Sequence, residues 1–256
     1  MMSINLAKDS NWLNILLQMS ILYYNYVVDK IMYNTDDIKK LLVDKYKTQD
    51  FRVTKTGVKT VELQNVQFIA DKDYILREPN YDYIKREIEW YESQSLNVYD
   101  IPGETPTIWK SCADVNGEIN SNYGWMIWSK ENGSQYNNCI WNLVNDPATR
   151  NAVMIYNRPS MHVDATSNHK HDFCCTYAVQ CFLNPTDDGY SLKYIVYMRS
   201  NDAVFGYNND INWHKYVQSK MVEELRVKLN CNITEEPIIW NAGSLHVYER
   251  HFKFLQ

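Results

Sequence analysis

The chain has 256 residues, which is enough for one large domain or two small ones. Aromatic residues make up 14% of it and charged residues 22%, a composition that excludes a disordered chain and indicates a packed, enzyme-like globule. The net charge of -5 provides no general attraction to nucleic acid, so we expect no nucleic-acid partner and expect local Lys or Arg side chains to hold any anionic ligand.

The first predicted element is an amphipathic helix over residues 12–28. Its sequence, WLNILLQMSILYYNYVV, carries Asn14, Gln18 and Asn25 and is shorter than the roughly 20 apolar residues that a membrane-spanning helix needs. No small-residue cleavage site follows it. We therefore expect residues 1–32 to form a helical extension that packs on the body or on a partner, and we expect no membrane span.

The later elements follow from the spacing of apolar residues. Helical spacing predicts helices over 34–47, 80–94, 134–145 and 211–229. A Thr-Gly turn and short alternation predict a hairpin or strand entry over 54–71, and runs rich in β-branched and aromatic residues predict strands over 152–156, 174–183, 192–200 and 237–248. Pro102, Gly103 and Pro106 break regular structure between 99 and 110. These elements predict one α/β domain over 33–256.

The six cysteines lack CxxC spacing, which favours reduced thiols in a cytosol over disulfides or a zinc site. Two of them, Cys174 and Cys175, are adjacent at the start of a predicted strand. Because neighbouring strand residues point to opposite faces, we expect one thiol in the core and the other at a cavity. Arg199, on a neighbouring apolar run, would stabilise a thiolate or bind an anion. The residues alone leave open whether either thiol is a nucleophile or an inert core residue.

Several ordered motifs resemble the thymidylate synthase superfamily. They are YGW at 123–125, NDPATR at 145–150, a Cys five residues before Gln180, RSND at 199–202 with Gly206 after it, and GSLHVY at 243–248. The segments DIPGETPTIW (100–109) and GEINSNYGWMIWS (117–129), with Thr176 where thymidylate synthases have His, look closest to the phage-encoded deoxycytidylate hydroxymethylase branch. The resemblance covers roughly residues 33 to 252. It implies a thymidylate synthase-like α/β (α+β) fold, with a mixed sheet packed by helices and an obligate-type dimer through the sheet.

The resemblance also implies an activity. A one-carbon unit from 5,10-methylenetetrahydrofolate would be joined to carbon 5 of dCMP and hydrated, giving 5-hydroxymethyl-dCMP and tetrahydrofolate without a metal. Carbon 5 of cytosine is a poor nucleophile until a thiolate adds to carbon 6, and counting back from Gln180 gives Cys175 as that nucleophile. The implied location is the cytoplasm, that of an infected host cell for a phage-encoded chain.

The resemblance carries over to residues in three roles. The implied catalytic residues are Cys175, Glu87, Tyr123 and Asp210; the implied nucleotide-binding residues are Lys55, Arg150, Arg199, Ser200, His246 and Tyr248; and the implied folate contacts are Trp109 and Asp202. Arg150 would come from the partner subunit of a homodimer. The family often has a second Arg at the next position, where this chain has Asn151.

Asp210 is the most informative of these positions, because thymidylate synthases have Asn there. A carboxylate offers only acceptors, which suits a cytosine protonated on its ring nitrogen, whereas an amide suits uracil. The alternative interpretation is a helix N-cap before residues 211–229.

Three other functions stay open. The first is thymidylate synthase or dUMP hydroxymethylase activity in the same fold. The second is a non-catalytic subunit that joins other nucleotide-synthesis enzymes through residues 1–32. The third, a Cys-His hydrolase, lacks any local motif.

Overall fold

The computed structural model describes residues 32–53, 55 and 57–256, so the helix predicted over 12–28 lies outside the described residues. The helices are α2 (Thr35–Lys47), α3 (Tyr81–Ser93), α4 (Thr107–Cys112), α5 (Tyr123–Trp128), α6 (Gln135–Asn145), α7 (Ser160–Ser167) and α8 (Gly206–Leu229), with 3-10 helices η1 (Val98–Asp100) and η2 (Glu249–Leu255). The strands are β1 (Tyr33–Asn34), β2 (Arg52–Val53), β3 (Lys59–Ile69), β4 (Val153–Ile155), β5 (Thr176–Thr186), β6 (Gly189–Met198), β7 (Asn201–Asp202), β8 (Asn232–Glu235) and β9 (Ile239–Tyr248). None of the helices in the described part of the chain is long and apolar enough to cross a membrane.

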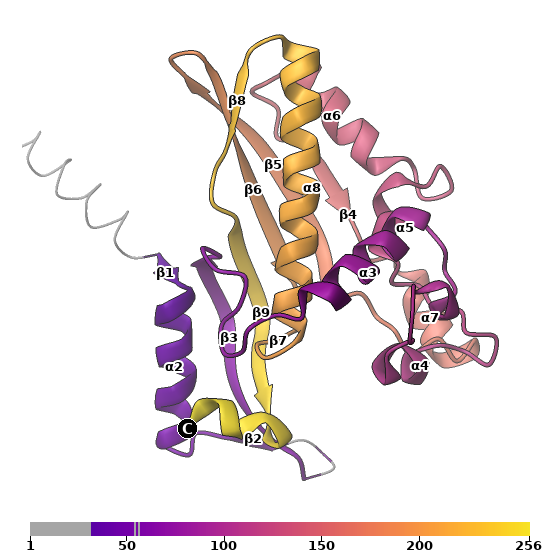
Figure 1. Cartoon of the computed structure of the whole chain (residues 1–256), viewed down its shortest axis with the longest axis vertical. Helices are drawn as coiled ribbons and strands as arrows, with labels where there is room; N and C mark the ends of the chain where they lie inside the picture. Colours follow the sequence, from indigo (N-terminus) through magenta and orange to yellow (C-terminus); the bar gives the residue numbers. More distant parts are fainter. Residues whose placement is uncertain (1–31, 54, 56) are drawn as a thin grey trace, which may run out of the picture. The chain divides into compact units, whose positions relative to one another are not determined.

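The main strands form one mixed sheet in the order β3-β9-β6-β5-β4 (Figure 1). The pairs β3/β9, β5/β6 and β4/β5 are antiparallel, whereas β6/β9 is parallel. The short strand β7 extends the sheet by pairing with β9, which places Asp202 opposite His246. The predicted mixed sheet is confirmed.

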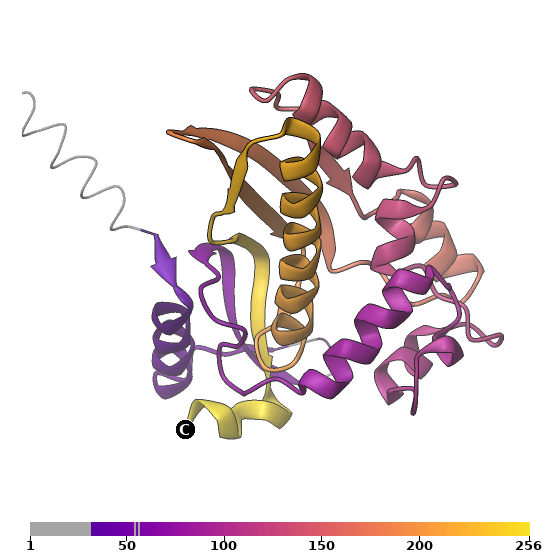
Figure 2. The same cartoon turned by 45° about the horizontal axis from the view of Figure 1, so that its top comes forward.

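Helix α8 runs along one face of the sheet, in front of β5, β6 and β9 (Figures 1 and 2). Alternation along β6 explains this packing, because Leu192, Tyr194, Val196 and Met198 are buried while the residues between them are only partly buried. The other face carries exposed apolar side chains, with Ile155 56% exposed and Tyr177 42% exposed. One face of the sheet therefore holds the core and the other remains accessible.

The predicted helices over 34–47, 80–94 and 134–145 and the strand over 237–248 are confirmed within a few residues. The prediction is wrong at three places. The stretch 99–110 contains η1 and the start of α4 rather than only irregular chain, and β5 begins at Thr176, after both cysteines. Helix α8 begins at Gly206, five residues earlier than predicted. Buried Tyr207 explains that early start, because its hydroxyl donates to the carbonyl of Lys72 at 2.9 Å.

Candidate active site

The segment just before β5 holds Cys174 and Cys175 in different surroundings. Cys174 is 1% exposed, and its Sγ lies 3.3 Å from the hydroxyl of Ser121. Cys175 is only partly buried. The prediction that strand alternation separates the two thiols is wrong, because neither cysteine belongs to the strand. The pairing of β5 instead shifts its register between Thr176 and Ala178, and such irregularities often redirect side chains beside active sites.

Hydrogen bonds on both sides hold the backbone of Cys175. The N–H of Arg199 donates to the Cys175 carbonyl at 2.9 Å, and the N–H of Thr176 donates to the hydroxyl of Tyr123 at 3.1 Å. The backbone that carries the thiol is therefore held by the residue that follows β6 and by α5, which are far apart in the sequence.

The Arg199 side chain folds back over the same segment. Its Nε donates to the carbonyl of Cys174 at 3.0 Å, and its Nη2 donates to the carbonyl of Phe173 and lies 4.0 Å from the Sγ of Cys175. The guanidinium thus brings a positive charge to the thiol and braces the chain that carries it. A planar guanidinium also suits bidentate binding of a phosphate.

The Cys175 thiol is not activated in the free protein. Burial raises its pKa to about 12, the charge of Asp210 adds to that rise, and Arg199 opposes it. At neutral pH the group is therefore a thiol, and a change in the charge of Asp210 would change its acidity.

Asp210 lies inside α8 rather than at its start, so the interpretation as a helix N-cap is wrong; the N-cap position belongs to Phe205. The Nδ2 of Asn201 donates to Asp210 Oδ2 at 2.8 Å, and the hydroxyl of Tyr123 also hydrogen-bonds the carboxyl. Burial first, and the charge of Glu87 second, raise the pKa of Asp210 well above its ordinary value. The carboxyl group consequently favours its protonated form before a cationic ligand arrives.

Glu87 lies on α3 and is 5% exposed. The hydroxyl of Tyr83, one helical turn earlier, donates to Glu87 Oε1, and the Nε1 of Trp109 lies 3.1 Å from the same oxygen and 3.0 Å from the Tyr83 hydroxyl. Burial raises the pKa of Glu87, and these two hydrogen bonds oppose the rise. Tyr83 was not among the predicted site residues, although its spacing of four residues from Glu87 places both on one helix face.

Close packing of α5 on α3 positions Tyr123. A Cβ added to Gly124 would lie 1.8 Å from the carbonyl oxygen of Tyr91, so only glycine permits this approach. The rings of Tyr91 and Tyr123 stack with centroids 5.3 Å apart. Tyr123 is buried, and its hydroxyl joins the Cys175 segment to Asp210.

The end of β9 and the strand β7 bring three more predicted residues together. The rings of His246 and Tyr248 lie 4.7 Å apart, which confirms that they share one side of the strand. Burial lowers the pKa of His246, against the opposing charge of Asp202, so its imidazole is neutral near pH 7. Asp202 accepts from the N–H of Val204 through Oδ1 at 2.9 Å.

The remaining predicted residues lie apart from these contacts. Lys55 is exposed in the turn between β2 and β3, and Ser200 is partly buried between β6 and β7. Arg150 is exposed just before β4, where its carbonyl accepts from the Nε2 of Gln180 at 3.1 Å. Within the described residues, no hydrogen bond or ion pair joins the side chain of Lys55 or Arg150 to Cys175 or Asp210.

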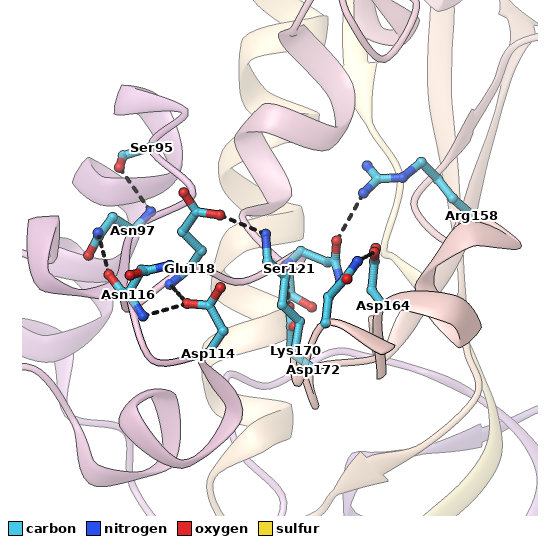
Figure 3. Close-up of polar contacts among 12 residues, drawn as sticks. Ser95, Asn97, Asp114, Asn116, Glu118, Ser121, Arg158, Asp164, Lys170 and Asp172 are labelled. Carbon is cyan, nitrogen blue, oxygen red and sulfur yellow. Dashed lines mark hydrogen bonds and ion pairs between the residues drawn. The ribbon is translucent and has the colours of Figure 1, made fainter. Parts of the chain in front are cut away.

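Polar contacts tie the loop before α5 to the segment that leads to Cys175 (Figure 3). Lys170 pairs with Glu118 at 2.9 Å. Buried Asp172 accepts from the N–H groups of Asn120 and Ser121 at 2.5 and 2.6 Å, and Arg158 Nη2 donates to Asn120 Oδ1 at 3.1 Å. These contacts hold the residues just before Tyr123 against those just before the two cysteines.

Together these residues make a polar cluster around one partly buried thiol. It contains Cys175, Arg199, Asp210, Asn201, Tyr123 and Glu87, and it combines a nucleophile, a cation and two carboxyl groups with raised pKa values. Such a set suits nucleophilic addition to a ring, coupled to proton transfer. In the part of the chain that the structure describes, no group of three or more His, Cys, Asp or Glu side chains is arranged to hold a metal ion.

The chain is similar to known proteins both in sequence and in structure. A family profile described as thymidylate synthase matches residues 26–256. The deoxycytidylate 5-hydroxymethyltransferases of Enterobacteria phages T4 and T6 are each 49% identical to the chain over 207 residues, covering 80% of this chain and 82% of each relative. A solved structure titled thermostable thymidylate synthase A from Bacillus subtilis is similar with a TM-score of 0.60 and 18% identity, covering 87% of this chain and 82% of that one. The structural match confirms the predicted fold class.

Proposed function

Because the chain belongs to the thymidylate synthase family, we propose that it transfers a one-carbon unit to carbon 5 of a pyrimidine nucleotide. The nucleotide is dCMP, the donor is 5,10-methylenetetrahydrofolate, and the products are 5-hydroxymethyl-dCMP and tetrahydrofolate. Identity of 49% to phage enzymes named for the deoxycytidylate reaction supports this assignment. It also supports action in the cytoplasm of an infected cell.

The observation that carries the choice of cytosine is the carboxyl group of Asp210 beside Cys175. Cytosine accepts at ring nitrogen 3 and donates from its 4-amino group, and after protonation it presents two donors. The protonated Asp210 carboxyl gives its proton to ring nitrogen 3, and the resulting carboxylate then accepts from both nitrogens. Uracil has a ring N–H and a carbonyl. A carboxylate can accept a hydrogen bond from the ring N–H, but it has no donor for the carbonyl.

Protonation of the ring also prepares the nucleophile. The Asp210 carboxylate that this transfer leaves would raise the pKa of Cys175, but the cationic base paired with it cancels that charge. The thiol gives its proton to water as Sγ forms a bond to carbon 6, and the electron pair of the carbon 5–carbon 6 double bond shifts to neutralise the ring. Carbon 5 of the resulting enamine becomes the nucleophile of the reaction.

The side chains of Trp109 and Asp202 fit a pterin ligand, because a partly buried indole offers a stacking face and a partly buried carboxylate accepts N–H groups. The folate supplies the one-carbon unit at the oxidation level of formaldehyde. Carbon 5 forms a bond to this unit. Loss of the carbon 5 proton and cleavage of the bond between the unit and the folate nitrogen, which releases tetrahydrofolate, leave an exocyclic methylene on the base, and water adds to it. Expulsion of Cys175 from carbon 6 then restores the aromatic ring.

Glu87 accepts the proton that the attacking water loses. It is buried, and the hydroxyl of Tyr83 and the indole N–H of Trp109 both converge on its Oε1. Because burial raises its pKa, the carboxyl group exchanges protons closer to neutral pH than an ordinary Glu. Tyr123 links the segment that carries the thiol to Asp210 and so holds Cys175 and Asp210 near each other.

The phosphate and sugar occupy the rim of this cluster. Arg199 and Ser200 bind the phosphate together with Lys55, while His246 and Tyr248 contact the sugar hydroxyl. The neutral imidazole of His246 has one donor and one acceptor for such a contact. Arg150 reaches the phosphate from the partner subunit.

The accessible face of the sheet supports a homodimer. Its side chains include Ile155, Tyr177, Phe182, Ile195 and Tyr197, and the rings of Tyr177 and Tyr197 lie 5.9 Å apart on it. Pairing two such faces would bury this apolar surface. Arg150 lies at the same face, next to Gln180, as donation in trans requires.

Release of tritium from carbon 5 of labelled dCMP in the presence of methylenetetrahydrofolate tests the function, with mass spectrometry to identify the product. The wild type should release tritium and form hydroxymethylated dCMP. Cys175→Ala should abolish release and covalent trapping by a 5-fluoropyrimidine nucleotide, whereas Cys174→Ala, the matched control, should retain both. The reverse pattern, or no release by the folded wild type, would refute the proposal.

A further inference from the structure

Asn201 is a buried polar residue with no role in the function proposed above. It lies on β7, is 2% exposed, and donates through Nδ2 to Asp210 Oδ2 at 2.8 Å. The amide and the carboxyl group are therefore packed directly together.

The other end of the same amide lacks a partner. Asn201 Oδ1 is buried and has no hydrogen bond within the described residues. Buried amide oxygens normally accept at least one hydrogen bond, so this acceptor suits a bound water. Asn208 Oδ1 is in the same situation, so the contact with Asp210, and not the unpartnered oxygen, distinguishes Asn201.

The direction of the Asn201 hydrogen bond favours one charge state of Asp210. An N–H donor stabilises a charged acceptor more than a neutral one. In agreement, the contact with Asn201 lowers the pKa of Asp210, against the larger effects of burial and of Glu87. Asn201 thus works in favour of the carboxylate.

We propose that Asn201 is a positioning residue for base selection: its Nδ2 fixes the orientation of the Asp210 carboxyl group and stabilises the carboxylate that forms when the proton passes to the base. This inference rests on the proposed function and extends it to a specificity-determining residue. Protonated cytosine presents two N–H donors to that carboxylate. Uracil presents a carbonyl, which needs an Asp210 that keeps its proton.

The test compares Asn201→Ala with the wild type on both dCMP and dUMP. Without the amide, Asp210 holds its proton more tightly, so the site pairs with uracil more readily. The ratio of kcat/KM for dUMP to that for dCMP should rise about tenfold to hundredfold, the range expected for losing one buried hydrogen bond to a charged group. The alkaline limb of the dCMP profile should move to higher pH, because the pKa of Asp210 rises.

Asn208→Ala is the matched control. Asn208 is also buried, lies in the first turn of α8 and donates to the carbonyls of Arg77 and Val204 at 2.8 and 3.2 Å, without contacting Asp210. The control should lose thermal stability but keep the wild-type substrate ratio and pH profile. A purely structural role for Asn201 would make the two variants alike.

An unchanged substrate ratio in folded Asn201→Ala, or an equal loss on both nucleotides, overturns the inference. If that variant lacks a cooperative thermal transition, Asn201→Ser is measured instead and should show a smaller change in the same direction; no change overturns the inference equally. If the wild type releases no tritium, the proposed function fails by itself. The inference about Asn201 is then tested by the equilibrium dissociation constants for dCMP and dUMP. It requires their ratio to differ between the wild type and Asn201→Ala, whereas the proposed function alone does not.

Discussion

The acidity of the Cys175 thiol is the most direct chemical consequence of its surroundings. Its pKa is raised from 9.0 to about 12. At neutral pH the thiolate population is therefore about a thousandfold smaller than that of an ordinary cysteine, since each pH unit is a factor of ten. The thiolate is the species that reacts with alkylating reagents. Alkylation of the free protein should consequently be slow at pH 7 and should accelerate about tenfold per pH unit, with no plateau near pH 9.

Two substitutions should change this rate in opposite directions. At a pH where Asp210 is ionised, its negative charge raises the pKa of Cys175; Asp210→Asn removes that charge, so alkylation there should be faster than in the wild type. Arg199→Gln removes the positive charge that lowers it, so alkylation should be slower. Both effects are electrostatic and should be present without nucleotide.

The assay is iodoacetamide labelling between pH 7 and pH 10, with fragment-ion mass spectrometry to distinguish Cys175 from its neighbour. Cys174 provides an internal control, because it is 1% exposed and should remain unlabelled in the folded protein. Circular dichroism confirms that each variant is folded. A plateau near pH 9, or a change of the same sign in both variants, would refute the electrostatic account of this thiol.

Three further predictions concern other residues. Asp210→Asn should shift the kcat/KM ratio toward dUMP by about one to two orders of magnitude, measured with both nucleotides at saturating folate, and an unchanged ratio would contradict the base assignment. Tyr83→Phe removes a hydrogen bond that lowers the pKa of Glu87, so the acidic limb of the kcat profile should move to higher pH; a fixed limb would leave Glu87 without its assigned role. Burial lowers the pKa of His214 to about 3, so between about pH 6.5 and pH 3 protonation favours the unfolded state. This group should reduce the free energy of unfolding by about 1.4 kcal/mol for each pH unit of acidification, and His214→Gln should have a shallower dependence in urea titrations at pH 7, 5.5 and 4. Parallel dependences would exclude a buried neutral His214.

Long periodic segments were predictable from the sequence, and short ones were not. Helix α2 and helix α3 each span 13 residues, long enough for apolar spacing to emerge. Helices α4 and α5 have six residues each, fewer than two turns, so no period is visible. The first residues of α8 have weak helix propensity, and contacts with the rest of the fold stabilise them instead.

The candidate site was predictable as a set of residues but not as a set of contacts. Ordered motifs predicted Cys175 and Arg199, and the alignment that these motifs set with the family predicted Asp210. The bond between Asn201 and Asp210 crosses the turn from β7 into α8, and neither residue type indicates such a partner in advance. That turn, rather than any spacing along the chain, determines which amide meets the carboxyl group.

The order of strands has a consequence for how the protein is made. Strand β9 lies between β3 and β6, although it is the last strand of the described chain (Figure 1). During synthesis the earlier strands emerge first and must wait for β9 before the sheet can close. Until then the facing edges of β3 and β6 present unpaired backbone groups, which are open to pairing with other chains. Nascent chains should therefore aggregate more readily than the finished protein, and deleting β9 should leave no partly folded domain with an intact sheet.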